Sequence, residues 1–202
     1  MDRALQIGIT GGIGSGKSLV CRIFQSLGIS AYDADSHAKE LMTTDGILVT
    51  EIKKEFGVLS YNPDGSLNRA YLARTVFNDA KRLATLNKLV HPRVGLNYKV
   101  WADQKKHHPY ILKEAALLFE SGASQSLDAV IVVHAETELR ISRVLKRDPH
   151  RGREQVLAIM DSQMPEEEKL KRADFVIRND ETSLLIPQIL ALHHKFCLLR
   201  EK

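Results

Sequence analysis

The chain has 202 residues, of which 44% are hydrophobic and 27% charged, the composition of a globular protein with one enzyme-sized domain and room for a small insertion. Its formal net charge of +4 is mildly basic and favours an anionic small-molecule substrate over nucleic acid. Two cysteines, Cys21 and Cys197, are too few for a disulfide framework and too far apart in sequence for a zinc or thiol-pair motif.

The sequence shows no pattern typical of a membrane span or of an export signal. The best candidate for a membrane span, Ala115–Val133, is interrupted by Glu120 and Asp128. The N-terminal apolar stretch is rich in glycine and ends in Lys17, unlike a signal peptide. We therefore expect a cytoplasmic protein with no membrane, nucleic-acid or obligate protein partner.

Short apolar runs alternate with helical patterns along the chain, beginning with a helix over Ser18–Leu27. Strands that alternate with helices predict an α/β fold with a mostly parallel sheet covered on both faces. The runs expected to form strands are Leu5–Thr10, Ile29–Tyr32, Tyr110–Leu112, Ala129–His134 and Phe175–Ile177.

Two stretches without strand patterns look like helical insertions. The first, Ser36–His107, is interrupted by the turn Asn62-Pro63-Asp64-Gly65, and Asn68 is placed to cap a helix that follows it, over Arg69–Val76. The second, Arg140–Arg172, is rich in charge. Its last part, residues 165–172, carries acids first and bases last, which suits a short helix and its dipole.

A phosphate-binding loop is the strongest signal in the chain. Gly11-Gly12-Ile13-Gly14-Ser15-Gly16-Lys17-Ser18 follows the first apolar run and leads into a helix, which is the context that this motif requires. Glycines let several backbone N–H groups turn toward one anion, and the helix N-terminus adds partial positive charge. Lys17 is expected to reach the β- and γ-phosphates of ATP, and the Ser18 hydroxyl to ligate Mg²⁺.

The loop indicates a nucleoside triphosphate but not its use. Motor ATPases and GTPases carry an apolar strand that ends in Asp, whereas Tyr110–Leu112 runs into Lys113-Glu114 and Ala129–Val133 runs into His134. The guanine-reading Asn-Lys-x-Asp is also missing. These absences favour phosphate transfer to a small molecule.

An acidic pair, Asp33 and Asp35, ends the second apolar run, and Ser36 is a candidate cap for the next helix. Parallel strands point their carboxyl ends at the ligand, so a carboxylate here could accept or orient the proton of an attacking hydroxyl. On an extended segment the two side chains point to opposite sides, which leaves one to face the γ-phosphate. A capping or turn-forming pair is the alternative.

Taken in order, these residues resemble the dephospho-coenzyme A kinases. The resemblance covers roughly residues 5–195 and includes the loop from Gly8 to Ser18 and the run Asp33-Ala34-Asp35-Ser36-His37-Ala38. It continues through Leu89-Val90-His91-Pro92, Leu117-Leu118-Phe119-Glu120, Lys146-Arg147-Asp148 and residues 173–179.

The resemblance implies the fold and reaction of that family. The fold is a P-loop kinase three-layer sandwich with a five-stranded parallel sheet, made of a core (1–35, 108–139 and 173–202), a helical substrate-binding insertion (about 36–107) and a helical lid (about 140–172). The implied reaction uses ATP and Mg²⁺ to phosphorylate the ribose 3′-hydroxyl of dephospho-CoA, the last step of coenzyme A synthesis. Asp35 is implied as the base, with Asp33 as its supporting neighbour.

Lid arginines complete the predicted machinery. Arg140, Arg143 and Arg147 share one helical face. The resemblance selects Arg147 to neutralise the transferring phosphoryl group, while Arg140 and Arg143 are expected to face solvent.

Three single residues keep two interpretations each. His91, before Pro92, marks either a helix break or a substrate contact. Asn179 either caps a turn or, by resemblance, lies near the adenine of ATP. Glu120 is either a helix-dipole acid or part of the substrate pocket wall. The alternatives for the whole protein are a kinase for another nucleoside or nucleoside monophosphate, and a regulatory module that binds a nucleotide without transferring phosphate.

Overall fold

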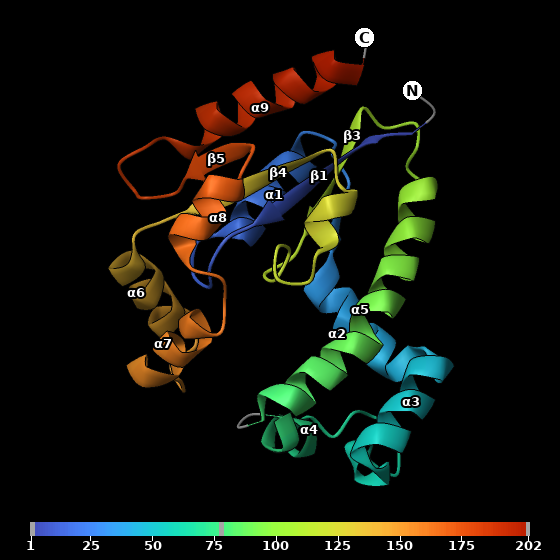
Figure 1. Cartoon of the computed structure of the whole chain (residues 1–202). Coiled ribbons are helices and arrows are strands. Elements are labelled where there is room, and N and C mark those ends of the chain that lie inside the picture. Colours follow the sequence, from blue (N-terminus) through green and yellow to red (C-terminus); the bar gives the residue numbers. More distant parts are fainter. Residues whose placement is uncertain (1–2, 77–78, 201–202) are drawn as a thin grey trace. The chain divides into compact units, whose positions relative to one another are not determined.

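The chain folds around a five-stranded, all-parallel sheet, which confirms the predicted fold class. The structure is a computed structural model that describes residues 3–76 and 79–200. The strand order is β2-β3-β1-β4-β5, so the first strand lies at the centre (Figure 1). The strands are β1 (Leu5–Thr10), β2 (Ala31–Asp33), β3 (Tyr110–Glu114), β4 (Ala129–His134) and β5 (Phe175–Arg178).

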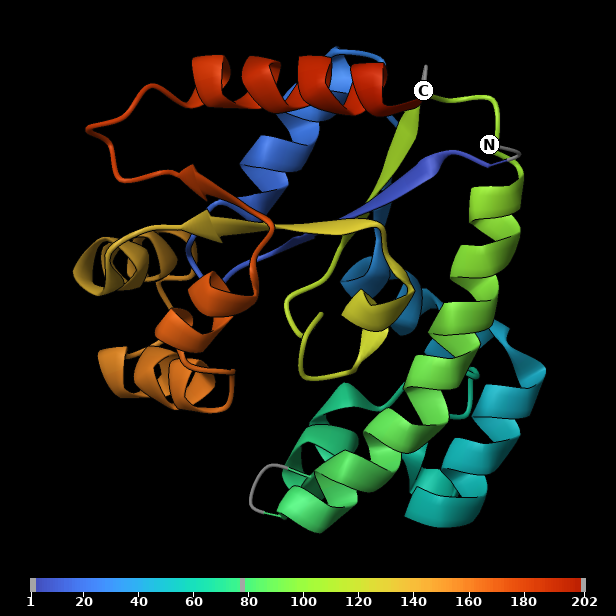
Figure 2. The ribbon, with the colours of Figure 1, turned by 45° about the horizontal axis from the view of Figure 1, so that its top comes forward.

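The strand register brings functional side chains to one edge of the sheet. Ile9 in β1 pairs with Glu114 in β3, and Glu114 also pairs with Asp33 in β2. At the other side His134 in β4 pairs with Arg178 in β5. Because all pairs are parallel, the loops after these strands leave from the same edge, and the arrows of β4 and β5 point the same way in Figure 2.

One face of the sheet carries the main core. Helices α1 (Lys17–Ser26) and α9 (Leu185–Arg200) pack on this face and against each other (Figure 1 and Figure 2). Tyr110 of β3 makes edge-to-face contacts with Phe24 of α1 and Phe196 of α9. All three rings are buried, as the continuous apolar runs of the strands predict for a sheet covered by helices.

The opposite face is closed by the segment that follows β3 and by helix α8 (Glu166–Arg172), which packs on β4. That segment includes the short helix η2 (Ala123–Ser126). A side chain at Gly8 in β1 would come within 2.6 Å of Leu118, so the segment lies directly on the central strand. The chain that follows β3 is therefore tightly packed against the sheet.

The segment predicted to form the lid, called the lid below, has a second small core and belongs to the same compact unit as the sheet. It consists of α6 (Thr137–Arg147), α7 (Arg153–Asp161) and α8. Ile141, Val144 and Val156 are buried together between α6 and α7, and Ile13 of the phosphate loop packs against them. The lid therefore contacts the phosphate loop directly in this structure.

Residues Ala34–Trp101 form the other compact unit, which is helical. It contains α2 (Ala34–Thr44), α3 (Gly46–Phe56), η1 (Val58–Ser60), α4 (Arg69–Val76) and most of α5 (Ala80–Asp103). Asn68 caps α4 by accepting a bond from Tyr71 N–H (3.1 Å), and the turn at Asn62–Gly65 closes with a 3.0 Å bond, as predicted. In the described residues, no helix has both the length and the apolar character that crossing a membrane requires.

Two local expectations are not met: the Ser36 cap and, of the two interpretations of His91-Pro92, the helix break. Ser36 does not cap α2, because the helix begins directly after the strand at Ala34; Asp35 lies in its first helical turn rather than on an extended segment, where its charge suits the helix dipole. Pro92 does not break α5. The buried residues Val90 and Val94, one turn apart on either side of it, hold the helix together at the cost of one backbone bond.

Candidate active site

The phosphate loop has the conformation that its sequence predicts. Gly14 and Gly16 have φ values of +80° and +92°, which glycine adopts without strain, and α1 begins immediately afterwards. The Lys17 ammonium donates to the carbonyl oxygens of Gly11 (2.9 Å) and Gly12 (3.4 Å). Its positive charge is therefore held over the loop, at the N-terminus of a helix.

A hydroxyl and a carboxylate meet beside this loop. Ser18 donates from its hydroxyl to Glu114 at the end of β3 (2.8 Å). The strand is longer than the predicted run Tyr110–Leu112 and extends through Lys113 and Glu114, so it ends in an acid, although not in the Asp of motor ATPases and GTPases. Burial raises the pKa of the Cys21 thiol, and the neighbouring Glu114 carboxylate raises it further, so Cys21 stays protonated.

Asn179 reaches the loop from the end of β5. Its side-chain amide donates to the Ser15 carbonyl (2.8 Å), and its own carbonyl accepts from Arg143 (3.0 Å). Arg143 also pairs with Glu181 (3.1 Å). Asn179 is thus fixed against the phosphate loop. The sequence predicts that Arg143 faces solvent, but it is partly buried and donates to the backbone carbonyl of Asn179.

The lid arginine that contacts the loop is Arg140. Its side chain is only 6% exposed; Nε donates to the Ile13 carbonyl (3.1 Å) and Nη1 to Glu166 (2.9 Å). The expectation that Arg140 faces solvent is wrong, and the sequence held a signal: Arg140 lies one turn before Val144, which is buried. Gln163 accepts from Ile13 N–H (3.0 Å), a contact that no sequence motif indicated.

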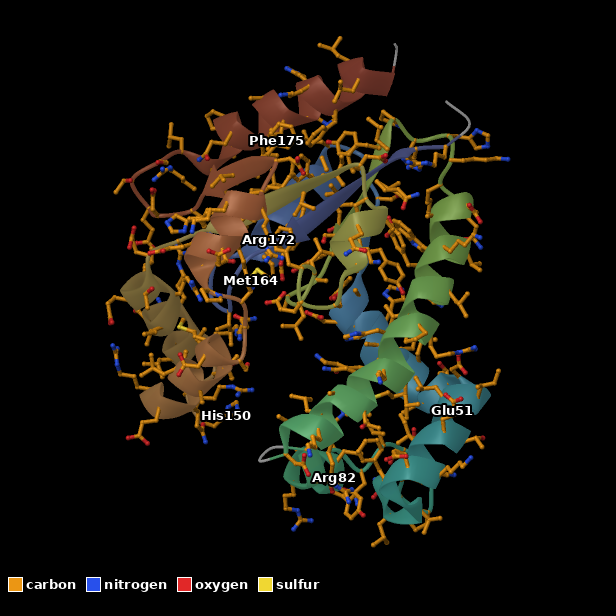
Figure 3. The ribbon with its side chains drawn as sticks, viewed as in Figure 1. Glu51, Arg82, His150, Met164, Arg172 and Phe175 are labelled. Carbon is orange, nitrogen blue, oxygen red and sulfur yellow. The ribbon has the colours of Figure 1, made fainter. Side chains whose placement is uncertain are left out.

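Arg147 lies at the end of α6 and is exposed. Its guanidinium bonds to Asp148 (3.1 and 2.9 Å), and this bond raises the pKa of Arg147. Arg151 also pairs with Asp148 (3.2 Å). The labelled His150 lies in the same loop, on the side of the lid away from the sheet (Figure 3).

Glu120 anchors the lid to the connection after β3. One of its carboxylate oxygens accepts from Met164 N–H (2.7 Å) and pairs with the fully buried Lys169 (3.1 Å). Burial by itself would raise the pKa of Glu120, but these bonds outweigh it and hold the pKa below the ordinary value. The contacts favour an anchoring role; Met164 is labelled in Figure 3, in the turn before α8.

The predicted acceptor-side residues divide between the units. Asp33 ends β2 in the sheet unit, while Asp35 on α2 and His91 on α5 lie in the helical unit. Burial lowers the pKa of His91, and the Asp35 carboxylate acts in the opposite direction, so the two side chains are within electrostatic reach of each other.

The assembled sheet-unit residues have the arrangement typical of an anion-binding site: a glycine loop, one lysine at a helix N-terminus, and a hydroxyl–carboxylate pair beside them. The dephospho-CoA kinase family model matches residues 5–184. The chain belongs to the dephospho-CoA kinase family. This confirms the resemblance seen in the sequence and makes the chain a kinase.

Two curated dephospho-CoA kinases and one solved structure are similar to the chain over most of its length. The dephospho-CoA kinase of Bacteroides fragilis (strain YCH46) is 39% identical over 189 residues, which are 94% of this chain and 91% of the relative. The dephospho-CoA kinase of Chlorobium chlorochromatii is 42% identical over 184 residues, 88% of this chain and 86% of the relative. The crystal structure of TT1252 from Thermus thermophilus matches with a TM-score of 0.84 at 36% identity, covering 96% of this chain and 97% of that one.

The Glu120–Lys169 anchor makes a prediction about stability. Glu120→Gln leaves the buried Lys169 charge without its counter-ion, so the free energy of unfolding at pH 7 should fall by about 3–5 kcal/mol. Because the folded pKa of Glu120 lies below its ordinary value of 4.5, its contribution is present above that pH and is lost as pH falls through the folded pKa.

Urea unfolding of the wild type and Glu120→Gln at several pH values measures this difference, with Glu167→Gln, an exposed acid on α8, as the matched control. The gap between wild type and Glu120→Gln should narrow on acidification. A gap that is independent of pH, or equally large for the control, contradicts the prediction.

Proposed function

We propose that this chain transfers the γ-phosphoryl group of ATP to the ribose 3′-hydroxyl of dephospho-CoA, giving coenzyme A and ADP in the last step of coenzyme A synthesis. The observation that carries the proposal is the complete phosphate loop, with Lys17 and the Ser18–Glu114 pair beside it, in a member of the dephospho-CoA kinase family. The reaction belongs in the cytoplasm, and the reduced thiols Cys21 and Cys197 suit that compartment.

ATP binds in the phosphate loop. Backbone N–H groups within Gly12–Ser18 hold its phosphates, apart from the Ile13 N–H, which is bonded to Gln163. Lys17 exchanges the loop carbonyls for the β- and γ-phosphates. The Ser15 hydroxyl is buried and has no hydrogen-bond partner among the described residues, so it can donate to a phosphate oxygen. Asn179, fixed at the Ser15 carbonyl, lies at the adenine side.

The Ser18–Glu114 pair suits a magnesium ion. A hydroxyl and a carboxylate 2.8 Å apart are the hard oxygen donors that Mg²⁺ prefers, and this ion commonly uses few protein ligands together with phosphates and water. We propose that Ser18 ligates the ion and Glu114 orients the hydroxyl. A bound ion would neutralise charge on the phosphates.

Acceptor activation is assigned to residues at the end of β2 and the start of α2. Asp35 accepts the proton of the 3′-hydroxyl, or orients that hydroxyl for in-line attack, and Asp33 supports it. His91 contacts the substrate from α5, and its neutral form is favoured by burial. Arg147 on the exposed end of the lid neutralises charge that develops on the transferring group.

These roles correspond to a division of labour along the chain. We propose that residues 1–35, 108–139 and 173–202 form the ATP-binding core and that residues 36–107 bind the substrate. Residues 140–172 form a lid, which contributes arginine and excludes water. The rate enhancement then comes from positioning and electrostatics, since the protein forms no covalent intermediate.

The acceptor is tested with a panel of hydroxyl compounds and labelled ATP. Dephospho-CoA should be phosphorylated with the highest kcat/KM, and phosphate should appear on its 3′-oxygen. Preferred transfer to a free nucleoside or nucleoside monophosphate would make the chain another kinase. ATP binding without product from any acceptor would make it a regulatory module.

Asp35→Asn tests the base. It should lower turnover with dephospho-CoA by about 10²–10⁴-fold, the contribution typical of a general base, with little change in ATP affinity. A coupled ADP-release assay measures turnover, and Glu40→Gln, an exposed acid on the same helix, is the matched control. Near-normal turnover of folded Asp35→Asn would remove Asp35 from this role.

Magnesium dependence tests the Ser18–Glu114 pair. Chelation of divalent ions should reduce ADP release to background, and Ser18→Ala should raise the magnesium concentration needed for half-maximal activity by about tenfold or more. Ser26→Ala at the other end of α1, where the hydroxyl bonds only to the Arg22 carbonyl among the described residues, should leave that concentration unchanged. Full activity in the presence of chelator would exclude this assignment.

A further inference from the structure

Ile13, at the tip of the phosphate loop, is held by the lid through three separate contacts. Its side chain packs against the small lid core of α6 and α7. Its carbonyl accepts from Arg140 Nε on α6 (3.1 Å), and its N–H donates to the side-chain oxygen of Gln163 between α7 and α8 (3.0 Å). Both backbone polar groups of one loop residue are thus bonded to side chains from two separate segments of the lid.

We propose that Arg140 and Gln163 are positioning residues for the phosphate loop, which fix the two peptides on either side of Ile13 so that the Gly14 N–H is aimed at the phosphates before ATP arrives. The inference rests on the proposed binding of ATP in this loop. It assigns to the lid a function in the protein without bound nucleotide, in addition to any closure over bound substrates.

The orientation follows from peptide geometry. The carbonyl of Ile13 and the N–H of Gly14 belong to one planar trans peptide and point in opposite directions. A carbonyl fixed toward Arg140 therefore turns the next N–H away from the lid helix. Gly14 is the residue that permits this turn, since its φ is +80° and a side chain there would collide with the Arg140 backbone.

Arg140 is built to hold a fixed geometry. It is buried, and its planar fork is divided between the loop carbonyl and Glu166, which in turn lies 3.0 Å from Nδ1 of His134 at the end of β4. The guanidinium also lies so close to Gly12 that a side chain there would overlap it. A lysine offers one ammonium group and cannot reproduce two bonds in these directions.

Gln163 has comparable support. The next residue, Met164, is bonded through its N–H to Glu120, and Glu120 is paired with the buried Lys169. The segment that carries Gln163 is therefore fixed to the connection after β3. A glycine-rich loop loses much conformational entropy when it orders, and a loop ordered in advance binds phosphate without that loss.

The test compares Arg140→Lys and Gln163→Met with matched controls at exposed sites, Arg153→Lys on the lid and Gln125→Met in η2. Each test variant should raise the KM for ATP and the Kd for ADP by about tenfold, the loss expected for one well-placed hydrogen bond. The KM for dephospho-CoA should stay within about twofold. The controls should match the wild type in all three constants.

Circular dichroism and thermal unfolding midpoints show whether each variant is folded and stable. Kinetics are measured well below those midpoints, so that a change in KM or Kd reports the positioning of the loop and not a loss of stability. The proposal would be overturned if the folded variants kept the wild-type KM for ATP and Kd for ADP, whether or not their thermal midpoints were lowered. If Arg140→Lys does not fold, Gln163→Met on the half-buried turn decides the result. Wild-type protein that binds ADP but makes no coenzyme A would refute the proposed function, while the ADP affinities would still decide this inference.

Discussion

The structure depends on keeping a glycine-rich loop open around an anion that it must bind through backbone N–H groups. Such a loop cannot stabilise itself, because its glycines gain little from packing and lose much entropy on ordering. The chain supplies external supports instead. Asn179 holds the Ser15 carbonyl, and the lid holds Ile13. Within the motif itself, Lys17 bonds the carbonyls of Gly11 and Gly12. The binding site is therefore formed as much by neighbouring elements as by its own motif.

Two ion pairs with a buried cation connect the lid to the sheet and to the phosphate loop. Lys169 is completely buried, and its partner Glu120 comes from the connection after β3, so the pair joins the lid to the sheet. The buried Arg140 and the partly exposed Glu166 form a second pair at the loop itself. An ion pair of this kind adds little net stability relative to apolar packing, but breaking it is costly. We infer that these pairs specify one arrangement of lid and loop, which a phosphate site requires.

The fold was largely readable from the sequence because its signals are local. Apolar runs alternating with amphipathic helices predicted all five strands within about two residues, and the phosphate loop was recognised from glycine spacing and context. Errors arose where a neighbouring element changed the outcome. Pro92 stays inside a helix because Val90 and Val94 are buried around it, and the third strand reaches Glu114 because β1 and β2 pair with it there.

By itself, the sequence determined the strands and the glycine loop, since each is encoded by residues close together in the chain. Its resemblance to the family selected Asp35 as the candidate base. Only the tertiary structure decided which distant side chains reach the loop. Arg140 and Gln163 lie 127 and 150 positions beyond Ile13, and the lid arginine that touches the loop is not the one that the motif favoured. A hydrogen bond depends on direction and burial at both ends, and neither is encoded in the spacing of residues along one chain segment.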